Sequence, residues 1–277
     1  MPFDHDQFRK TDSENLWTLI MRVREKAPLI HNITNFVVMN NTANTLLAIG
    51  ASPAMIHSVD EVEDFVAISQ ALVVNIGTLD SVWIAACKLA AIKARNADIP
   101  WIFDPVGAGA TPYRQTVANA LVQLKPTVIR GNGSEILSVA QKAGEGRGVD
   151  SLHSSETAIN AARHLAKLTK GTVAITGAVD YVTNGTQVME IHNGHPLMAR
   201  VTGLGCSATA VIGAFLAVEP DAFTATVAAL TFFGVAGELA AERSPGPGTL
   251  QVGLLDTLYA LDGATFSQRA VVKPYVS

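Results

Sequence analysis

Residues 101–130 read WIFDPVGAGATPYRQTVANALVQLKPTVIR, and this stretch decides the fold class. The short apolar run Trp101–Asp104 predicts a strand, Pro112–Leu124 predicts a helix, and Thr127–Arg130 predicts a second strand. Glycines after the first strand mark a sharp turn before the helix. A strand, a helix and a strand in this order form a right-handed βαβ unit, whose two strands are parallel.

The same alternation continues on both sides of this unit, from about residue 14 to residue 176. The other predicted strands are Pro53–Ile56, Ala71–Ile76 and Val173–Thr176. The other predicted helices are Asn35–Ile49, Asp60–Ser69, Ser81–Ala97, Ser134–Ala140 and Ser155–Leu168. Repeated βαβ units predict an α/β fold, in which a central, mostly parallel sheet has helices on both faces.

The pattern changes after residue 176. A late β-meander is predicted at Tyr181–Thr183, Gln187–His192 and Leu197–Val201, with Asn-Gly turns between the strands. A helical C-terminal part follows at Ser207–Val218, Ala222–Arg243 and Leu250–Leu261. Because no linker interrupts the pattern, we expect a single domain over residues 1–277. Segments 1–13 and 267–277 are expected to be mobile tails.

Composition narrows the class of protein. Hydrophobic residues make up 48% of the chain and charged residues 16%, and the formal net charge is −4. With 20 Lys and Arg against 24 Asp and Glu, no basic surface for nucleic acid is indicated. Only two cysteines occur, which favours a reducing, cytoplasmic location. The apolar stretch Ala222–Ala241 contains Thr and Glu, so we expect a buried helix rather than a membrane span.

Ligands of open α/β sheets bind beyond the carboxyl ends of the strands. Polar, charged and glycine residues gather after several predicted strands, and Thr202–Cys206 is the sharpest case. Two glycines before a small-residue helix expose backbone N–H groups at a positive helix end, which suits a phosphate or an oxyanion. A tight turn that needs glycine only for its geometry is an equal alternative.

Three charged residues at the same sheet edge have two interpretations each. Asp104 and Glu135 suit Mg²⁺ that bridges nucleotide phosphates. Alternatively, Asp104 caps the helix that opens near Thr111-Pro112, and Glu135 is a first-turn helix residue that the helix dipole favours. Arg130 suits a phosphate clamp or a surface salt bridge. For the segment His31–Asn35, capping of a helix is the more probable role on physical grounds alone. No GxxxxGK[ST] motif occurs, which excludes a P-loop kinase.

Six motifs occur in a fixed order and resemble the hydroxyethylthiazole kinase family. They are PLIHNITNFVVMNNTANTLLAIGASPAM (28–55), VVNIGTL (73–79), FDPVGAGATPYR (103–114), IRGNGSEI (129–136), VAITGAVDYV (173–182) and TGLGCSATA (202–210). The resemblance extends from about Pro28 to Ala240 and implies a ribokinase-like fold. It implies transfer of the ATP γ-phosphate to the hydroxyl of 4-methyl-5-(2-hydroxyethyl)thiazole, with Mg²⁺, for thiazole salvage in thiamine biosynthesis. It also implies a cytoplasmic homotrimer with sites at the subunit interfaces.

The resemblance assigns roles to single residues. The assignments are catalytic Cys206, Gly203 and Gly205; substrate-binding Met55, Gly203 and Asn35; ATP-binding Arg130, Thr176 and Asn132; and metal-binding Asp104 and Glu135. Related sugar and pyrimidine kinases usually place an Asp at the position of Cys206. A thiol of pKa about 8.5 is mostly protonated at neutral pH, although the helix N-terminus is able to lower that value. We therefore expect the anion hole at Gly203–Cys206 to matter more than proton abstraction by the thiol.

Three other functions are compatible with the same fold. A hydroxymethylpyrimidine kinase would fit the motifs less well, because Cys206 stands in place of the usual Asp. An ATP-dependent dehydratase acting on hydrated nicotinamide nucleotides would release water and form no phosphorylated product from its substrate. A non-catalytic binding protein is disfavoured, because Asp104, Arg130, Glu135 and the glycine loop all remain.

Overall fold

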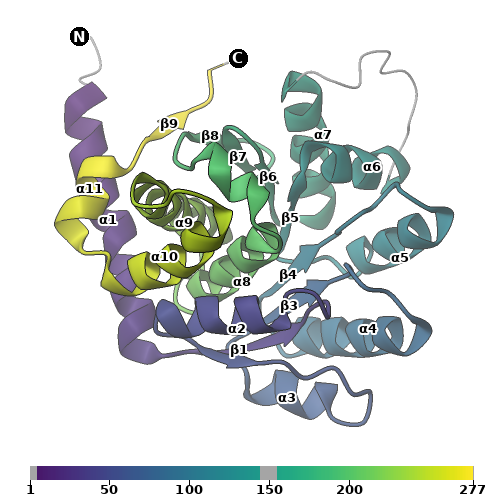
Figure 1. Ribbon diagram of the computed structural model, residues 1–277. Coiled ribbons are helices and arrows are strands. Elements are labelled where there is room, and N and C mark those ends of the chain that lie inside the picture. The colour runs from purple at the N-terminus through teal and green to yellow at the C-terminus, as the bar shows by residue number, and fades with distance from the viewer. Residues whose placement is uncertain (1–4, 144–154, 277) are drawn as a thin grey trace.

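A computed structural model describes residues 5–143 and 155–276 of the chain (Figure 1). Nine strands form one sheet in the order β2-β1-β3-β4-β5-β6-β7-β8-β9. The strands are β1 (Leu29–Ile33), β2 (Ser52–Ala54), β3 (Ala71–Asn75), β4 (Trp101–Asp104), β5 (Val128–Asn132), β6 (Thr172–Thr176), β7 (Asp180–Thr183), β8 (Val188–Ile191) and β9 (Val272–Pro274). Neighbouring strands are parallel from β2 to β6 and antiparallel from β6 to β9.

Helices cover both faces of this sheet (Figure 1). They are α1 (His5–Lys26), α2 (Met39–Ala48), α3 (Val62–Ile68), α4 (Ser81–Asn96), α5 (Pro112–Val122), α6 (Gly133–Ala143), α7 (Ser155–Thr169), α8 (Leu204–Leu216), α9 (Ala222–Glu242), α10 (Pro247–Ala260), α11 (Gly263–Arg269) and the short 3-10 helix η1 (Pro196–Arg200). The α/β fold with a mostly parallel sheet is therefore confirmed.

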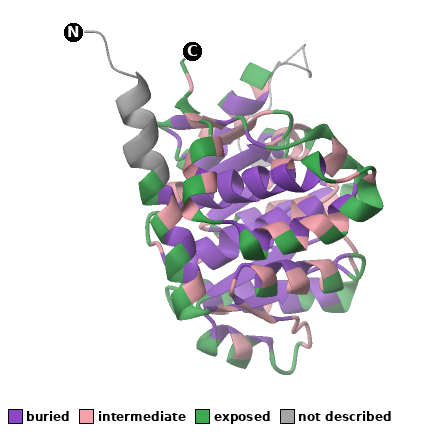
Figure 2. Cartoon of the chain, turned by 60° about the vertical axis from the view of Figure 1, so that its left-hand side comes forward, coloured by how far each residue is buried: buried purple, intermediate pink, exposed green. Residues whose placement is uncertain are grey.

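Two hydrophobic cores lie on opposite faces of the sheet. Residues alternate between them along a strand: Val73 of β3 packs with α8 and α9, whereas Leu72 and Val74 pack with α3 and α4. Buried residues accordingly lie in the middle of the molecule, and exposed residues lie on its outer helix faces and loops (Figure 2). Because the central strands are buried on both faces, their sequences are continuous apolar runs rather than alternating ones.

Helix α9 confirms the expectation for the late apolar stretch. Among the described residues it is the one helix long and apolar enough to cross a membrane, and most of it is buried inside the protein. It packs between α8 and α10 and contacts β6, β7 and β8. Its apolar composition is therefore explained by its position in the core.

The start of the fold differs from the prediction. The segment His31–Asn35, interpreted as capping a helix, supplies the second half of β1, and α2 begins only at Met39. The side chains of His31 and Asn32 are buried. The His31 ring hydrogen-bonds with the backbone carbonyl of Ile56, and the Asn32 amide donates to that of Ile30. These bonds satisfy one polar atom of each side chain and so reduce the cost of burying it in a strand, whereas His31 Nδ1 and Asn32 Oδ1 are buried without a hydrogen-bond partner.

The end of the fold also differs. Leu197–Val201 does not form the third strand of the meander, because Pro196 opens the 3-10 helix η1 there. The third strand is β9, which pairs with β8 through Ile191 and Val272. Segment 267–277, expected to be a mobile tail, therefore contains the end of α11 and a sheet strand. Helix α1 likewise begins inside segment 1–13, of which residues 1–4 lie outside the described part.

The packing of Phe232 allows a test of the core formed with α8, α9 and α11. Its fully buried ring lies 6.2 Å from that of Phe215 and 6.5 Å from that of Phe266. Phe232→Ala should lower the free energy of unfolding by about 3–5 kcal/mol, because it leaves a cavity. Urea unfolding at fixed protein concentration measures this. Tyr259→Ala is the control, since that side chain is 75% exposed and its loss should cost less than about 0.5 kcal/mol. Equal losses would contradict the packing described.

Candidate active site

Polar side chains from five parts of the chain meet at the carboxyl ends of the parallel strands. Asn35 follows β1, Asn75 ends β3, Asp104 ends β4, Arg130 lies in β5 and Thr176 ends β6. Strands β1 and β3 are neighbours although β2 lies between them in sequence, so the strand order reverses there. Such a switch point leaves a crevice in which open α/β sheets bind ligands.

Asp104 is the central charge of the site. Its side chain is completely buried, and its Oδ2 accepts hydrogen bonds from Asn75 Nδ2 (2.9 Å) and Thr209 Oγ1 (2.8 Å). The Nη1 atom of Arg130 lies 3.9 Å from the same oxygen. Burial raises the pKa of the Asp104 carboxyl to about 6, whereas the charge of Arg130 opposes this rise. Asp104 does not cap the next helix, because Thr111 accepts from Arg114 N there.

Asn75 connects Asp104 to Cys206. Its Nδ2 also donates to Cys206 Sγ at 3.2 Å, and its Oδ1 accepts from Asn35 Nδ2 at 2.9 Å. Asn35 Nδ2 lies 3.6 Å from the same sulfur. Asn35, Asn75, Cys206 and Asp104 therefore form one hydrogen-bonded network, which we call the amide network.

The Cys206 thiol is protonated at neutral pH. Burial and the neighbouring Asp104 carboxylate raise the pKa of this thiol to about 11, although the bonds from Asn75 and Asn35 favour the thiolate. The helix N-terminus, which is able to lower a thiol pKa, does not lower that of Cys206. Loss of water and a nearby negative charge outweigh the helix dipole here.

Arg130 is buried beside the start of α8, so it is not a surface salt bridge. Its side chain is only 12% exposed and donates to Thr176 Oγ1. A Cβ atom on Gly205 would lie 2.7 Å from Arg130 Nη1, closer than real Cβ contacts allow. Gly205 is therefore required for the guanidinium to lie against the helix N-terminus.

Gly203 forms the N-cap of α8 with φ +83°, in the left-handed region that favours glycine. A Cβ atom there would also lie 2.6 Å from Val38 Cγ1. Within the described chain no side chain caps this helix end, so the N–H groups of its first turn remain free to bind an anion. Cys206 lies in the same turn, next to these donors.

Glu135 and Asn132 form a reciprocal capping box at the start of α6. Asn132 Oδ1 accepts from Glu135 N, and Glu135 Oε2 accepts from Asn132 N, each at 2.9 Å. Glu135 Oε1 accepts from Gly107 N, also at 2.9 Å. Glu135 therefore lies in the first turn of α6, as one of its two interpretations requires, and each of its oxygens retains a lone pair. Among the described residues, no group of three or more His, Cys, Asp and Glu side chains forms a metal site.

Comparisons with known proteins agree with one another. The family model described as "Hydroxyethylthiazole kinase family" matches residues 20–264. The chain belongs to the hydroxyethylthiazole kinase family.

The relatives cover most of the chain. A hydroxyethylthiazole kinase of Granulibacter bethesdensis is 56% identical over 91% of this chain and 92% of its own length. A structure of a hydroxyethylthiazole kinase protein from Pyrococcus horikoshii superposes with a TM-score of 0.89 and 41% identity, covering 95% of this chain and 99% of that one. A pyridoxal kinase from Staphylococcus aureus, with a TM-score of 0.59 and 16% identity over 76% of this chain and 88% of its own, shares the ribokinase-like fold alone.

Of the residues that the family motifs assign, Met55 lies apart from the amide network. It follows the outer strand β2 and is separated from β3 by β1. Its side chain is half-buried. The other assigned residues lie at the ends of β1 and β4–β6 or at the starts of α6 and α8.

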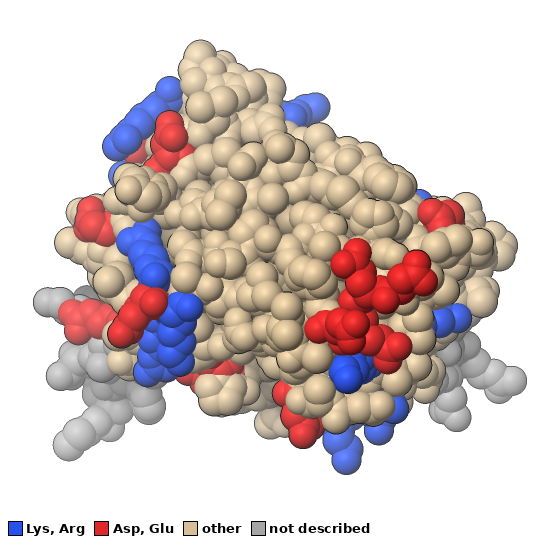
Figure 3. All heavy atoms as spheres, turned by 90° about the horizontal axis from the view of Figure 1, so that it is seen from below, with Lys and Arg blue, Asp and Glu red and all other residues tan. Residues whose placement is uncertain are grey.

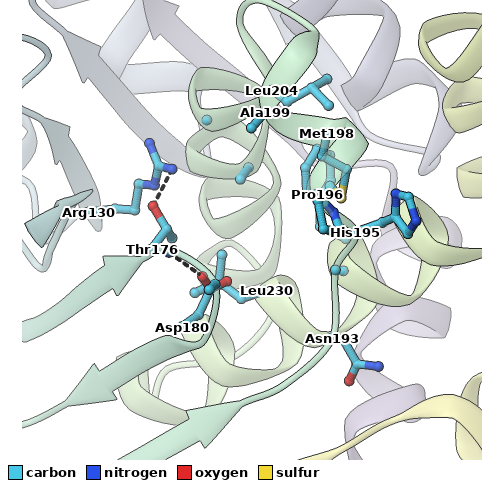
Figure 4. Close-up of a pocket in the computed structure, with 17 residues that line it drawn as sticks. Arg130, Thr176, Asp180, Asn193, His195, Pro196, Met198, Ala199, Leu204 and Leu230 are labelled. Carbon is cyan, nitrogen blue, oxygen red and sulfur yellow. Dashed lines mark hydrogen bonds between the residues drawn. The ribbon is translucent and has the colours of Figure 1, made fainter. Parts of the chain in front are cut away.

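A pocket of about 510 Å³ opens beside Arg130 and Gly205 (Figure 4). Its lining is Arg130, Thr176, Gly177, Ala178, Asp180, Asn193, Gly194, His195, Pro196, Met198, Ala199, Leu204, Gly205, Ala208, Leu230, Phe233 and Gly234. Polar side chains of β5, β6 and β7 lie on one side of the pocket, with Leu230 of α9 beside Asp180 (Figure 4). Apolar residues of η1 and α8 lie on the other side, together with the polar side chains of Asn193 and His195. Burial raises the pKa of Asp180 to about 6.

Three residues of the site were given no role from the sequence, although Asn75 was among the residues noted after a predicted strand. Asn75 and Thr209 bond Asp104, and Arg114 bonds the carbonyls of Ile76, Val106 and Gly77 and so fixes the two loops beside the site. All three lie inside the quoted family motifs. A strand-terminal Asn and a Thr one turn beyond Cys206 were the available signals, but each has many ordinary uses in proteins.

The raised pKa of Cys206 predicts slow alkylation. With a pKa of about 11, about 0.1% of the thiol is ionised at pH 8, so its reaction with iodoacetamide should accelerate roughly tenfold per pH unit up to pH 10. Mass spectrometry of folded protein measures the rate. Cys87 is the internal control, because it is buried and burial raises its pKa to about 12. If the alkylation rate of Cys206 reached half of its maximum below pH 8.5, the result would contradict the structure.

Proposed function

We propose that this chain transfers the γ-phosphate of ATP to the hydroxyl of 4-methyl-5-(2-hydroxyethyl)thiazole, for thiazole salvage in thiamine biosynthesis. The observation that carries the proposal is the position of the amide network, between Arg130 and the uncapped start of α8, in a chain of this family. The network offers polar contacts to an alcohol. The helix end and Arg130 offer positive charge to phosphates.

The nucleotide lies in the pocket beside Arg130. Arg130 and Thr176 bind its phosphates, and Asn132 lies next to them at the start of α6. The support is the placement of Arg130 and Thr176 on one side of a pocket that also has apolar lining from η1, α8 and α9, against which an adenine ring packs. The N–H groups of the first turn of α8 face the transferred phosphoryl group and stabilise its charge.

The thiazole lies at the other end of the site, against Met55, Gly203 and Asn35. Cys206 lies beside its hydroxyl. The support is the network contact between Asn35 and Cys206 at the switch point of the sheet. Met55 reaches the substrate from the neighbouring strand β2, beyond the polar network.

Asp104 and Glu135 are the residues that would hold Mg²⁺, and two observations fit this role. Asp104 Oδ1 is a buried carboxylate oxygen without a hydrogen-bond partner, and each Glu135 oxygen accepts only one bond. Mg²⁺ in kinases is usually held by one or two carboxylates, with phosphates and water as the remaining ligands. When bound, the ion would neutralise charge on the phosphates.

The chemistry needs little from the thiol. The bond from the γ-phosphorus to the β-bridging oxygen breaks as the substrate oxygen bonds to phosphorus, through a loose transition state. Cys206 is protonated and its sulfur accepts from two amides, so it is poorly suited to remove the hydroxyl proton. That proton passes to an oxygen of the transferred phosphoryl group or to solvent, while Gly203–Cys206 stabilise the charge.

The enzyme acts as a single-domain cytoplasmic homotrimer with sites at the subunit interfaces. Supporting this, Phe36 and Val37 directly follow Asn35 and are 62% and 63% exposed, and Leu47 of α2 is 59% exposed. Apolar side chains this exposed are typical of a protein interface. Seen from below, the molecule also has a wide area without Lys, Arg, Asp or Glu, with acidic side chains gathered on one side of it (Figure 3).

A mass-spectrometric assay with ATP and Mg²⁺ tests the reaction. The substrates are hydroxyethylthiazole, hydroxymethylpyrimidine, pyridoxal and ribose, each alone. We expect a thiazole monophosphate that needs Mg²⁺, with at least about tenfold less product from the others, which corresponds to about 1.4 kcal/mol of discrimination. Phosphorylation of hydroxymethylpyrimidine instead would identify a pyrimidine kinase. The absence of any phosphorylated product from folded, ATP-binding protein would refute the proposal.

Variants of Cys206 test its role. Cys206→Ser and Cys206→Asp should both retain kcat within about tenfold of the wild type, because each still accepts hydrogen bonds from Asn75 and Asn35. Steady-state kinetics with thiazole and ATP measures this, with isothermal titration of both ligands as the control for binding. If Cys206→Ser abolished turnover while both ligands still bound, proton transfer by the thiol would be essential.

A further inference from the structure

Asn75 uses its whole side-chain amide inside the protein. It ends β3, it is completely buried, and its Oδ1 accepts from Asn35 Nδ2 and Gly77 N, both at 2.9 Å. Its Nδ2 donates to Asp104 Oδ2 at 2.9 Å and to Cys206 Sγ at 3.2 Å. An amide has two hydrogens to donate and two lone pairs to accept with, so its capacity is completely used.

The two hydrogens of Asn75 point to the two ends of the site. One goes to Asp104, which lies beside Arg130 and the phosphates in the proposed function. The other goes to Cys206, which lies beside the attacking hydroxyl. A single planar group therefore spans the acceptor end and the phosphate end and fixes their separation.

Only an amide of this length fits the position. Asp in place of Asn75 would offer no hydrogens to Asp104 or Cys206, and an aliphatic residue would also leave Asn35 Nδ2 with only its 3.6 Å contact to Cys206 Sγ. Glycine at position 77 also leaves room for the contact between Asn35 and Asn75, because a Cβ atom on Gly77 would lie 2.5 Å from Asn35 Nδ2. The close approach of Asn35 to Asn75 thus depends on the glycine that follows β3.

We propose that Asn75 is a positioning residue that sets the geometry between the acceptor hydroxyl and the transferred phosphoryl group by bridging Cys206 and Asp104. The inference rests on the proposed kinase function for its effect on the rate. In-line transfer depends steeply on the alignment of attacking and leaving oxygens, so a displaced bridge lowers kcat more than it weakens binding.

Two substitutions separate the bridge from the rest of the amide. Asn75→Ala removes all four hydrogen bonds, whereas Asn75→Asp keeps the two accepted bonds and removes the two donated ones. Both should lower kcat at least about 30-fold, with KM for ATP within about threefold of the wild type. A wild-type kcat in Asn75→Asp would show that the two donated bonds are not needed and that Asn75 matters only as an acceptor for Asn35. A wild-type kcat in Asn75→Ala would mean that only the added charge matters. Either result overturns the proposal.

Thr209→Val is the matched control. It removes a 2.8 Å bond to the same oxygen of Asp104 but leaves the Asn75–Cys206 contact intact. Its loss of kcat should be several-fold smaller than that of Asn75→Ala. Equal losses of kcat in Thr209→Val and Asn75→Ala would show that the effect comes entirely from a lost bond to Asp104. This result would contradict the bridging role of Asn75.

A double-mutant cycle with Cys206→Ala completes the test, because alanine cannot accept the amide bond. The kcat loss from Asn75→Ala should fall below about tenfold in the Cys206→Ala background, and the two losses of unfolding stability should be non-additive. Urea unfolding needs no turnover, so it tests the contact independently. An inactive wild type would refute the kinase function, whereas additive losses in both measurements would refute the bridge.

Discussion

The burial of one carboxylate, that of Asp104, constrains the whole site. A charge removed from water is tolerated only if other groups compensate for it. The compensating groups come from three further elements: Asn75 from β3, Arg130 from β5 and Thr209 from α8. Their bonds fix how α8 packs across the ends of the strands. Burial chiefly, and then this carboxylate, raise the pKa of the Cys206 thiol, so the buried charge contributes to both the geometry and the protonation of its surroundings.

The sequence predicted the central part of the fold because that part follows simple rules. Strands β3 to β6 are buried on both faces, and their apolar runs stand out between helices. Strand β1 was missed, because His31 and Asn32 are polar residues whose burial depends on bonds to carbonyls of Ile56 and Ile30. Strand β9 was missed because three residues carry almost no pattern, and pairing with β8 alone makes them a strand.

Much of the site was also predictable, because residues after parallel strands necessarily meet at one edge. Arg130, Thr176, Asp104, Gly205 and Cys206 all lie there. The protonated state of Cys206 at neutral pH was expected, but the rise of its pKa was not predictable, since that rise depends on burial and on the nearby Asp104. Nor were the roles of Asn75 and Thr209, because a hydrogen bond between residues 29 or 105 positions apart leaves no local signal. Chain position indicated where the site lies but not how its residues are connected.

The pairing of β9 with β8 has a consequence for biosynthesis. Val272 emerges from the ribosome roughly 80 residues after Ile191, its partner in the sheet. Until then β8 is the open edge of a large sheet, and an uncovered edge is a template for pairing with other chains. Nascent chains are therefore exposed to edge-to-edge association until this short strand is added. Shortening the chain before residue 272 would make that exposure permanent.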